Sequence, residues 1–206
     1  MAYGYIRRRF AVVKVGFLVE GGCERIVLKS AAFQAYLAET RIQQIGDVID
    51  MDGKGNLKVS SKRMQSQVKT LRDLGAEWIV VLRDLDNAVS FDTVKAEVYQ
   101  ADDIIACMAV QELEAWFVAD SGTLSVLFGT SFYHDAPETI SKPAVFLHDQ
   151  RVQYTQRGIR DKKGFATAMV NNGFSIERAA AHPNCPSARY FLTKLQTLAS
   201  ANASAN

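Results

Sequence analysis

Residues 78–86 read Trp-Ile-Val-Val-Leu-Arg-Asp-Leu-Asp, and this stretch decides the fold class. Its first part, Trp78 to Leu82, is a continuous apolar run with the length and composition of a β-strand. A continuous run is expected for a strand that is buried on both faces of a parallel sheet. We therefore expect a buried parallel strand, followed at once by the two carboxylates of Asp84 and Asp86.

Three other runs also have the character of strands, and helical segments lie between them. Phe10–Val19 is the first run, Ile42–Ile49 is a weaker, alternating second, and Ile104–Val110 is the last. Glu24–Ala38 and Ser61–Leu74 read as the intervening helices. Strands that alternate with helices are typical of a parallel sheet with right-handed crossovers. The sequence predicts an α/β fold, a parallel β-sheet flanked by helices.

The second half of the chain predicts helices rather than further strands. We expect an α/β core over residues 1–120, a mostly helical extension over 121–198 packed on that core, and a small, polar, disordered tail over 199–206. The expected helices are Glu112–Ala119, one that begins at Pro143, Phe165–Val170, Ser175–Ala181 and Ser187–Leu198.

The amino-acid composition says little about binding partners, but the cysteines and the N-terminal region indicate where in the cell the protein works. Among 206 residues, 24 basic side chains nearly cancel 22 acidic ones, so any surface for nucleic acid must be local. Cys23, Cys107 and Cys185 are odd in number and far apart, which favours a reducing compartment. Lys14 interrupts the apolar run that begins at Phe10, so we interpret that run as a strand rather than a signal peptide. We expect a cytoplasmic protein that does not enter a membrane.

Acidic residues follow three of the predicted strands. Parallel strands end at one edge of their sheet, and open α/β sheets bind ligands along that edge. Like charges about 4 Å apart repel by roughly 1–4 kcal/mol, so such a cluster either takes up protons or binds a cation. Oxygen ligands favour Mg²⁺ or Mn²⁺ over zinc. The candidate ligands are Glu20, Glu24, Asp84, Asp86, Glu112 and Glu114.

The spacing of these residues adds to the hypothesis. Asp84 and Asp86 are two apart, so they face the same way if the segment is extended. Gly21 and Gly22 permit a tight turn after the first strand and close approach of a phosphate to backbone N–H groups. Taken alone, Glu24 or Glu112 reads as a helix cap, Asp-x-Asp as a loop, and Gly-Gly as a turn. The three acidic strand ends together favour a metal site.

Two of these segments resemble the signature of TOPRIM domains. That signature has Glu-Gly after the first strand and Asp-x-Asp after a later one, matched here by Val19–Glu24 and Asp84-Leu85-Asp86. The resemblance covers roughly residues 10 to 120 and implies a TOPRIM/Rossmann-like sheet. It implies Glu20 as general acid/base, Asp84 and Asp86 as Mg²⁺ ligands, and Glu24, Glu114 and, less directly, Glu112 at a second metal. Cys23 departs from the small hydroxyl residue that is usual in the motif.

Two more segments resemble a narrower TOPRIM-like group, related to the OLD-type nucleases. They are Val110–Trp116 and Cys185–Arg189. Members of that group are compact single-domain proteins, often encoded beside ABC-class ATPases in bacterial defence loci. The resemblance implies a defence effector that is controlled by an ATPase partner.

The leading hypothesis is a Mg²⁺- or Mn²⁺-dependent nuclease that hydrolyses phosphodiester bonds in DNA or RNA. A homodimer is a further hypothesis. Basic residues would neutralise the phosphate, with Lys163 as the catalytic candidate and Lys142, Lys162 and Arg189 as others. The run Arg157, Arg160, Lys162 and Lys163 could follow a nucleic-acid backbone. Two alternatives stay open: a binding or effector subunit that docks an ATPase, and a different phosphoryl-transfer enzyme on the same fold. No Walker A sequence is present.

Overall fold

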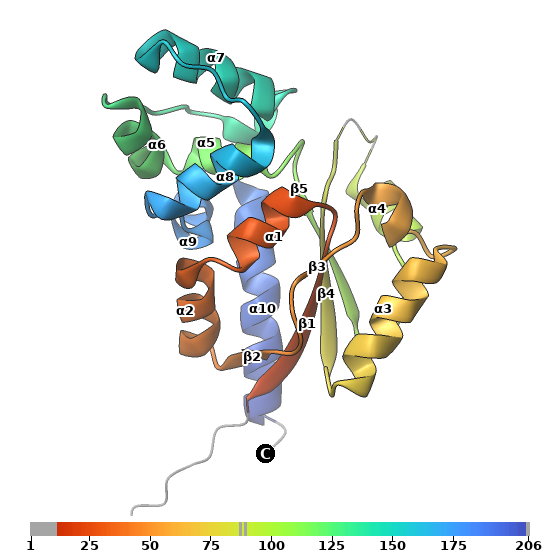
Figure 1. Ribbon diagram of the computed structural model, residues 1–206. Helices are drawn as coiled ribbons and strands as arrows, with labels where there is room; N and C mark the ends of the chain where they lie inside the picture. Colours follow the sequence, from red (N-terminus) through yellow and green to blue (C-terminus); the bar gives the residue numbers. More distant parts are fainter. Residues whose placement is uncertain (1–11, 87, 89, 205–206) are drawn as a thin grey trace, which may run out of the picture.

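The computed structural model describes residues 12–86, 88 and 90–204, and it shows an α/β fold. Five parallel strands form one sheet in the order β2-β1-β4-β5, and β3 pairs with the end of β1 (Figure 1). The strands are β1 (Val13–Val19), β2 (Ile42–Gln44), β3 (Ile49–Asp50), β4 (Trp78–Asp84) and β5 (Ile104–Ala109). The predicted fold class is confirmed.

Alternate residues of the strands belong to two separate hydrophobic cores, one on each face of the sheet. In β1, Phe17 and Val19 join one core while Leu18 between them joins the other, as the period of two in a strand requires. Helices α1 (Gly22–Leu28), α2 (Ala31–Glu39) and α10 (Pro186–Ser204) cover the first face. Helices α3 (Lys62–Asp73) and α4 (Phe91–Glu97) cover the second face (Figure 1).

The helical second half shares its core with the sheet. Its remaining helices are α5 (Glu114–Ala119), α6 (Ser121–Phe128), α7 (Pro143–Thr155), α8 (Lys162–Asn171) and α9 (Ile176–Ala181), with short 3₁₀ turns at Lys54–Leu57 (η1) and Pro137–Thr139 (η2). In Figure 1, α5 to α9 gather beyond the carboxyl ends of the strands, and α10 returns along the sheet. The Trp116 indole on α5 donates to Ser187 Oγ on α10 at 2.7 Å. The helical segment therefore forms one wall above the edge of the sheet at which β1 and β4 end.

The element boundaries depart from expectation in several places. The helix expected over Glu24–Ala38 is two helices, because the Ser30 hydroxyl accepts from Phe33 N and starts a new helix. The strand expected over Ile42–Ile49 is broken at Gly46, whose φ of 68° is left-handed. No sequence pattern predicted helix α4. The first strand begins at Val13, and Phe10 lies outside the described residues.

The chain end also differs from expectation. Helix α10 continues to Ser204, through most of the segment that was expected to be disordered. Buried Leu195 and Leu198 anchor the helix, and the alanines that follow have high helix propensity. Of the described helices, none is both long and apolar enough to cross a membrane.

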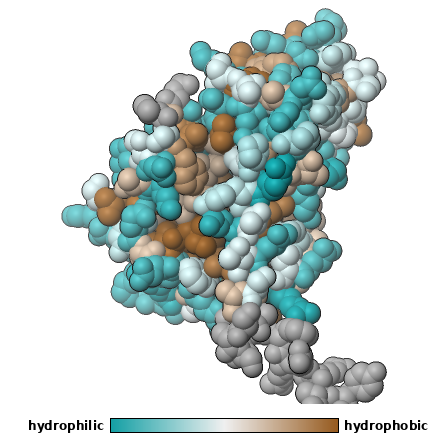
Figure 2. All heavy atoms as spheres, turned by 180° about the vertical axis from the view of Figure 1, so that it is seen from behind, coloured by the Kyte–Doolittle hydropathy of each residue, from teal (hydrophilic) through white to brown (hydrophobic). Residues whose placement is uncertain are grey.

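The surface seen from behind is mostly hydrophilic, with hydrophobic side chains gathered in a patch at the lower left (Figure 2). Exposed large apolar residues in the described part of the chain include Leu74 after α3, Val126 on α6 and Tyr133 in the segment that follows α6, so they come from separate parts of the chain. The homodimer stays a prediction.

Candidate metal centre at the carboxyl edge of the sheet

Four of the six predicted carboxylates line one cavity of about 260 Å³ where β1 and β4 end. They are Glu20 after β1, Glu24 on α1, Asp84 at the end of β4, and Glu114 at the start of α5. Lys162 and Lys163 at the start of α8 face them across the cavity. Segments that are far apart in the sequence thus meet at one point.

The register of the sheet positions Glu20 beside Asp84. Val19 pairs with Leu82, and Glu20 N donates to Leu82 O at 3.0 Å. Glu20 therefore lies beside the last residues of β4, which ends at Asp84. Asp84 N donates to Glu20 Oε2 at 3.3 Å. Asp84 Oδ1 accepts from Leu113 N at 2.8 Å, which ties β4 to the turn that follows β5.

Glu24 is buried because of its place in α1. It is the third residue of a helix whose N-cap is Gly21, and only 4% of it is exposed. Burial raises the pKa of Glu24 to about 7. The charges of Glu114 and Glu20 raise this pKa further, whereas hydrogen bonds from the backbone of Glu24 and Gly21 lower it. Glu24 is therefore not the N-cap itself; it lies at the third helical position, from which its carboxylate accepts a hydrogen bond from the backbone of the N-cap Gly21.

Glu114 carries the least satisfied carboxylate of the four. It is 3% exposed, and its Oε1 has no hydrogen-bond partner among the described residues. Lys162 Nζ lies 3.3 Å from that oxygen as an ion pair without hydrogen-bond geometry, and 3.1 Å from Glu112 Oε1. Burial lowers the pKa of Lys162, but Glu114 and Glu112 outweigh it and raise the pKa overall.

The cavity contains four carboxyl groups against two lysines, and burial together with mutual repulsion disfavours ionisation of all four at once. Burial raises the pKa of Glu20, of Asp84 and of Glu114 above their usual values. Glu24, Glu114 and Glu20 raise the pKa of Asp84 further, whereas the Arg83 guanidinium, 3.7 Å from Glu20, lowers that of Glu20. No pattern in the sequence predicted this buried arginine beside Glu20.

Asp86 and Glu112 lie outside the cavity lining. Asp86 follows the end of β4 and has a left-handed φ of 51°, so it does not face the same way as Asp84. It pairs instead with Lys54 at 2.9 Å, although its charge still raises the pKa of Glu20. Glu112 Oε2 accepts from Ala144 N at 3.2 Å in the first turn of α7.

The Gly21-Gly22 turn is covered on one side by a lysine. A Cβ at Gly22 would lie 2.2 Å from Cε of Lys163, so the glycine is what lets this side chain cross the turn. The lysine, rather than open space, therefore lies against Gly22. Cys23 also lines the cavity, and burial together with Glu114 and Glu24 raises its pKa to about 12, which disfavours the reactive thiolate.

Other basic candidates have structural roles or lie elsewhere. Arg189 donates to the backbone carbonyls of Ala180 and His182, so it ties α9 to α10. Lys142 is the exposed residue before α7 and does not line the cavity. Gly53 does line it, because Gly53 N donates to Glu20 O at 2.8 Å, and no sequence signal marked that loop.

The side chains present fit a hard divalent cation by their chemistry. The donors are carboxylate oxygens, and one of them, Glu114 Oε1, is buried without a hydrogen bond. As the side chains stand, no three His, Cys, Asp or Glu residues within the described ranges are arranged to hold a metal ion. Metal binding would therefore require side-chain rearrangement.

Comparisons with known proteins give no relative: no family model, curated protein or solved structure matches the chain.

Proposed function

We propose that the protein is a metal-dependent nuclease that hydrolyses phosphodiester bonds in DNA or RNA. The observation that supports this most is the cavity in which Glu20, Glu24, Asp84 and Glu114 meet two lysines. Excess carboxylates favour a cation, and lysines beside them favour an anionic substrate that approaches that cation. Mg²⁺ or Mn²⁺, when bound, would lower the pKa of a coordinated water and neutralise charge on the phosphate.

The position of each residue that lines the cavity suggests its proposed role in the reaction. Glu20, Glu24, Asp84 and Glu114 would hold the cation, because they line the cavity. Glu20 is the proposed general base, since its side chain is 18% exposed and can reach a water in the cavity. Lys163 has no ion pair with any carboxylate in the described part of the chain, so its ammonium group is free to donate to a phosphate oxygen.

The proposal includes conditional activity. Lys162 Nζ pairs with both Glu112 and Glu114 and so holds part of the charge that a metal would neutralise. This supports an effector whose site is completed by metal, substrate or a partner. The ABC-class ATPase partner, the cytoplasmic location and the homodimer belong to this proposal as well, and co-purification of the protein with an ABC-class ATPase would test the partner.

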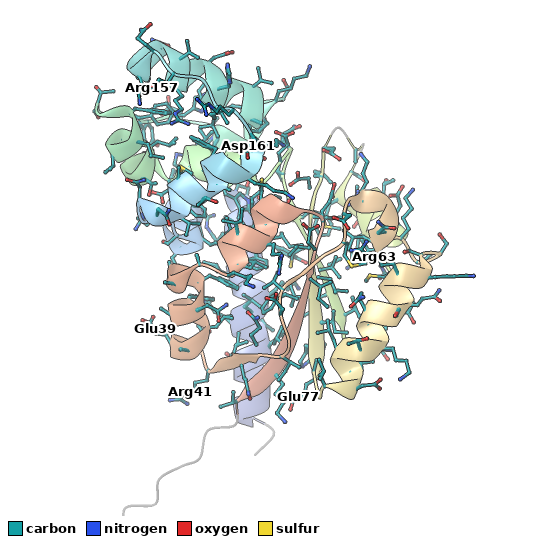
Figure 3. All side chains as sticks on the ribbon, viewed as in Figure 1. Glu39, Arg41, Arg63, Glu77, Arg157 and Asp161 are labelled. Atoms are coloured by element: carbon teal, nitrogen blue, oxygen red, sulfur yellow. The ribbon has the colours of Figure 1, made fainter. Side chains whose placement is uncertain are left out.

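The test is cleavage of supercoiled plasmid and of tRNA by purified protein with Mn²⁺. We expect Glu20→Gln to lower the rate on the order of 10²–10⁴-fold without loss of fold, because it removes the proton-accepting carboxylate. Glu39→Gln is the matched control, since Glu39 is exposed at the end of α2, far from the cavity (Figure 3). Equal cleavage by wild type and Glu20→Gln would reject this role of Glu20.

A further inference from the structure

A second cavity, of about 730 Å³, is lined by three arginines. Arg151 comes from α7, and Arg157 and Arg160 from the loop that joins α7 to α8. Figure 3 shows Arg157 at this upper, helical end of the molecule and Asp161 at the start of α8. The volume falls within the roughly 300–1,000 Å³ of sites that take a ligand of nucleotide size.

The arginines are not neutralised by the protein. Over the described residues, no ion pair joins Arg151, Arg157 or Arg160 to a carboxylate. The nearby Asp161 is engaged in capping α8, because it accepts from Gly164 N. Residues 143–165 carry five cationic and two acidic side chains, so the segment is basic although the whole chain has a net charge of only +2.

A third cavity, of about 760 Å³ next to Asp86, gives the contrast. It is also lined by three cations, but each has a carboxylate partner. Lys54 pairs with Asp86 at 2.9 Å, and Lys58 and Arg83 pair with Glu97 at 3.7 and 3.6 Å. Charge therefore favours an incoming polyanion at the arginine cavity rather than here.

The arginine loop is held in a defined place. Ile159 N donates to His148 Nδ1 at 3.1 Å, and a Cβ at Gly158 would lie 2.5 Å from Cε1 of His148. The Arg151 guanidinium lies over the Phe165 ring, 5.9 Å from its centroid. The loop is thus held against α7 through His148, and Arg151 packs on α8 through Phe165, in both cases by interactions other than ion pairs, which leaves the arginine charges available.

The two cavities share one short wall. Asp161, Gly164 and Phe165 line the arginine cavity, while Lys162 and Lys163 between them line the acidic one. A ligand that occupies both needs several phosphates linked along a chain. We propose that the arginine cavity binds the phosphate backbone of a nucleic-acid strand on one side of the bond that is cut. This rests on the proposed function of the acidic cavity and names the part of the substrate that lies beyond it.

The test measures binding without cleavage. Fluorescence anisotropy of labelled single-stranded DNA and RNA oligonucleotides, in EDTA, should show that Arg157→Ala with Arg160→Ala weakens binding about 10-fold, as expected for the removal of two exposed charges. The slope of log affinity against log salt should shrink by about 1.4, or 0.7 for each phosphate that the variant no longer neutralises. Lys62→Ala with Lys69→Ala removes the same charge from α3, on the other face of the sheet, and should change both values little.

A second substrate separates this inference from the proposed function. Bis(p-nitrophenyl) phosphate has a single phosphate and no neighbouring phosphates along a chain, so the arginine double variant should hydrolyse it with Mn²⁺ as fast as wild type. Hydrolysis of this diester with unchanged oligonucleotide affinity and salt slope in the double variant would overturn the arginine site alone. Oligonucleotide binding that depends on the arginines, without hydrolysis of either substrate, would support the arginine site and reject the nuclease.

Discussion

At the scale of single residues, Lys162 is the residue that most directly neutralises the carboxylates in and beside the acidic cavity. Its ammonium group lies between Glu112 and Glu114, and the latter is almost fully buried. No carboxylate pattern in the sequence predicts that a lysine fifty residues away would take this place. Its partner residues were predicted, however, as metal ligands.

Replacing Lys162 by Met should destabilise the metal-free protein. We expect a loss of about 1 kcal/mol at pH 8, because Glu114 keeps its burial but loses its counter-charge, while the half-exposed lysine limits the size of the effect. Urea unfolding would measure it, and millimolar Mn²⁺ should restore most of the loss. Lys142→Met is the control, since Lys142 has no ion pair in the described part of the chain. Equal losses in both variants would contradict the role of Lys162.

The carboxylates also predict how stability depends on pH without metal. Burial raises the folded pKa of Glu24 to about 7, above an unfolded value of about 4.3. The folded state therefore binds the Glu24 proton more tightly than the unfolded state does. The resulting contribution to the free energy of unfolding is fully present below about pH 4.3 and is lost as the pH rises through about 7. Asp47, whose pKa is lowered to about 2 by Lys29 and Arg25, acts in the opposite sense but below pH 4.

Melting temperature of the EDTA-treated protein should therefore fall between pH 5 and 8, and the fall should be smaller in Glu24→Gln. The same scan on Glu39→Gln gives the control, because Glu39 is exposed. A wild-type melting temperature that rises across this range would contradict the raised carboxylate pKa values.

Residue spacing predicted part of this site and missed part. Glu20 and Asp84 were predicted as site residues because each comes at the end of an apolar run, and the structure places them together. Asp86 depended on an extended segment, and its left-handed φ removes that premise. Backbone turns of this kind are set by neighbours in space, here by the hydrogen bond from Asp86 N to Gln111 O at 2.7 Å.

At the scale of elements, close packing of α3 on β1 depends on Gly16. A Cβ there would lie 2.8 Å from Cδ1 of Leu71, which is fully buried. We expect Gly16→Val to destabilise the fold by about 1–3 kcal/mol through overpacking, measured by urea unfolding. Adding Leu71→Ala should recover part of that loss because it opens the same space. Additive losses in the double variant would show that the clash with Leu71 is not the cause.

Strongly patterned elements were predictable, and elements made by local capping were not. The apolar runs of β4 and β5 and the 3.6-residue period of α3 stand out in the sequence. The break between α1 and α2 depends on one serine that caps a new helix inside an otherwise helical pattern. Helix α4 is short, with Val94 as its one buried residue, so its periodicity is weak.

At the scale of the whole molecule, the acidic cavity exists because the helical segment closes over the sheet. Glu20, Glu24 and Asp84 come from the sheet and its first helix, whereas Glu114, Lys162 and Lys163 come from α5 and α8. Predicting a core and an extension separately could not show this, because the helical segment and one face of the sheet share the same one of the two hydrophobic cores.

The central claim is that these carboxylates bind a divalent cation. The most direct measurement is the anomalous scattering of manganese in crystals grown with millimolar Mn²⁺. We predict a peak bounded by Glu20, Asp84 and at least one of Glu24 and Glu114, with Lys162 moved away from Glu114, because these carboxyl groups line one cavity and a cation would favour their ionised forms. An ordered cavity without such a peak, with Lys162 still paired to Glu114, would contradict the account.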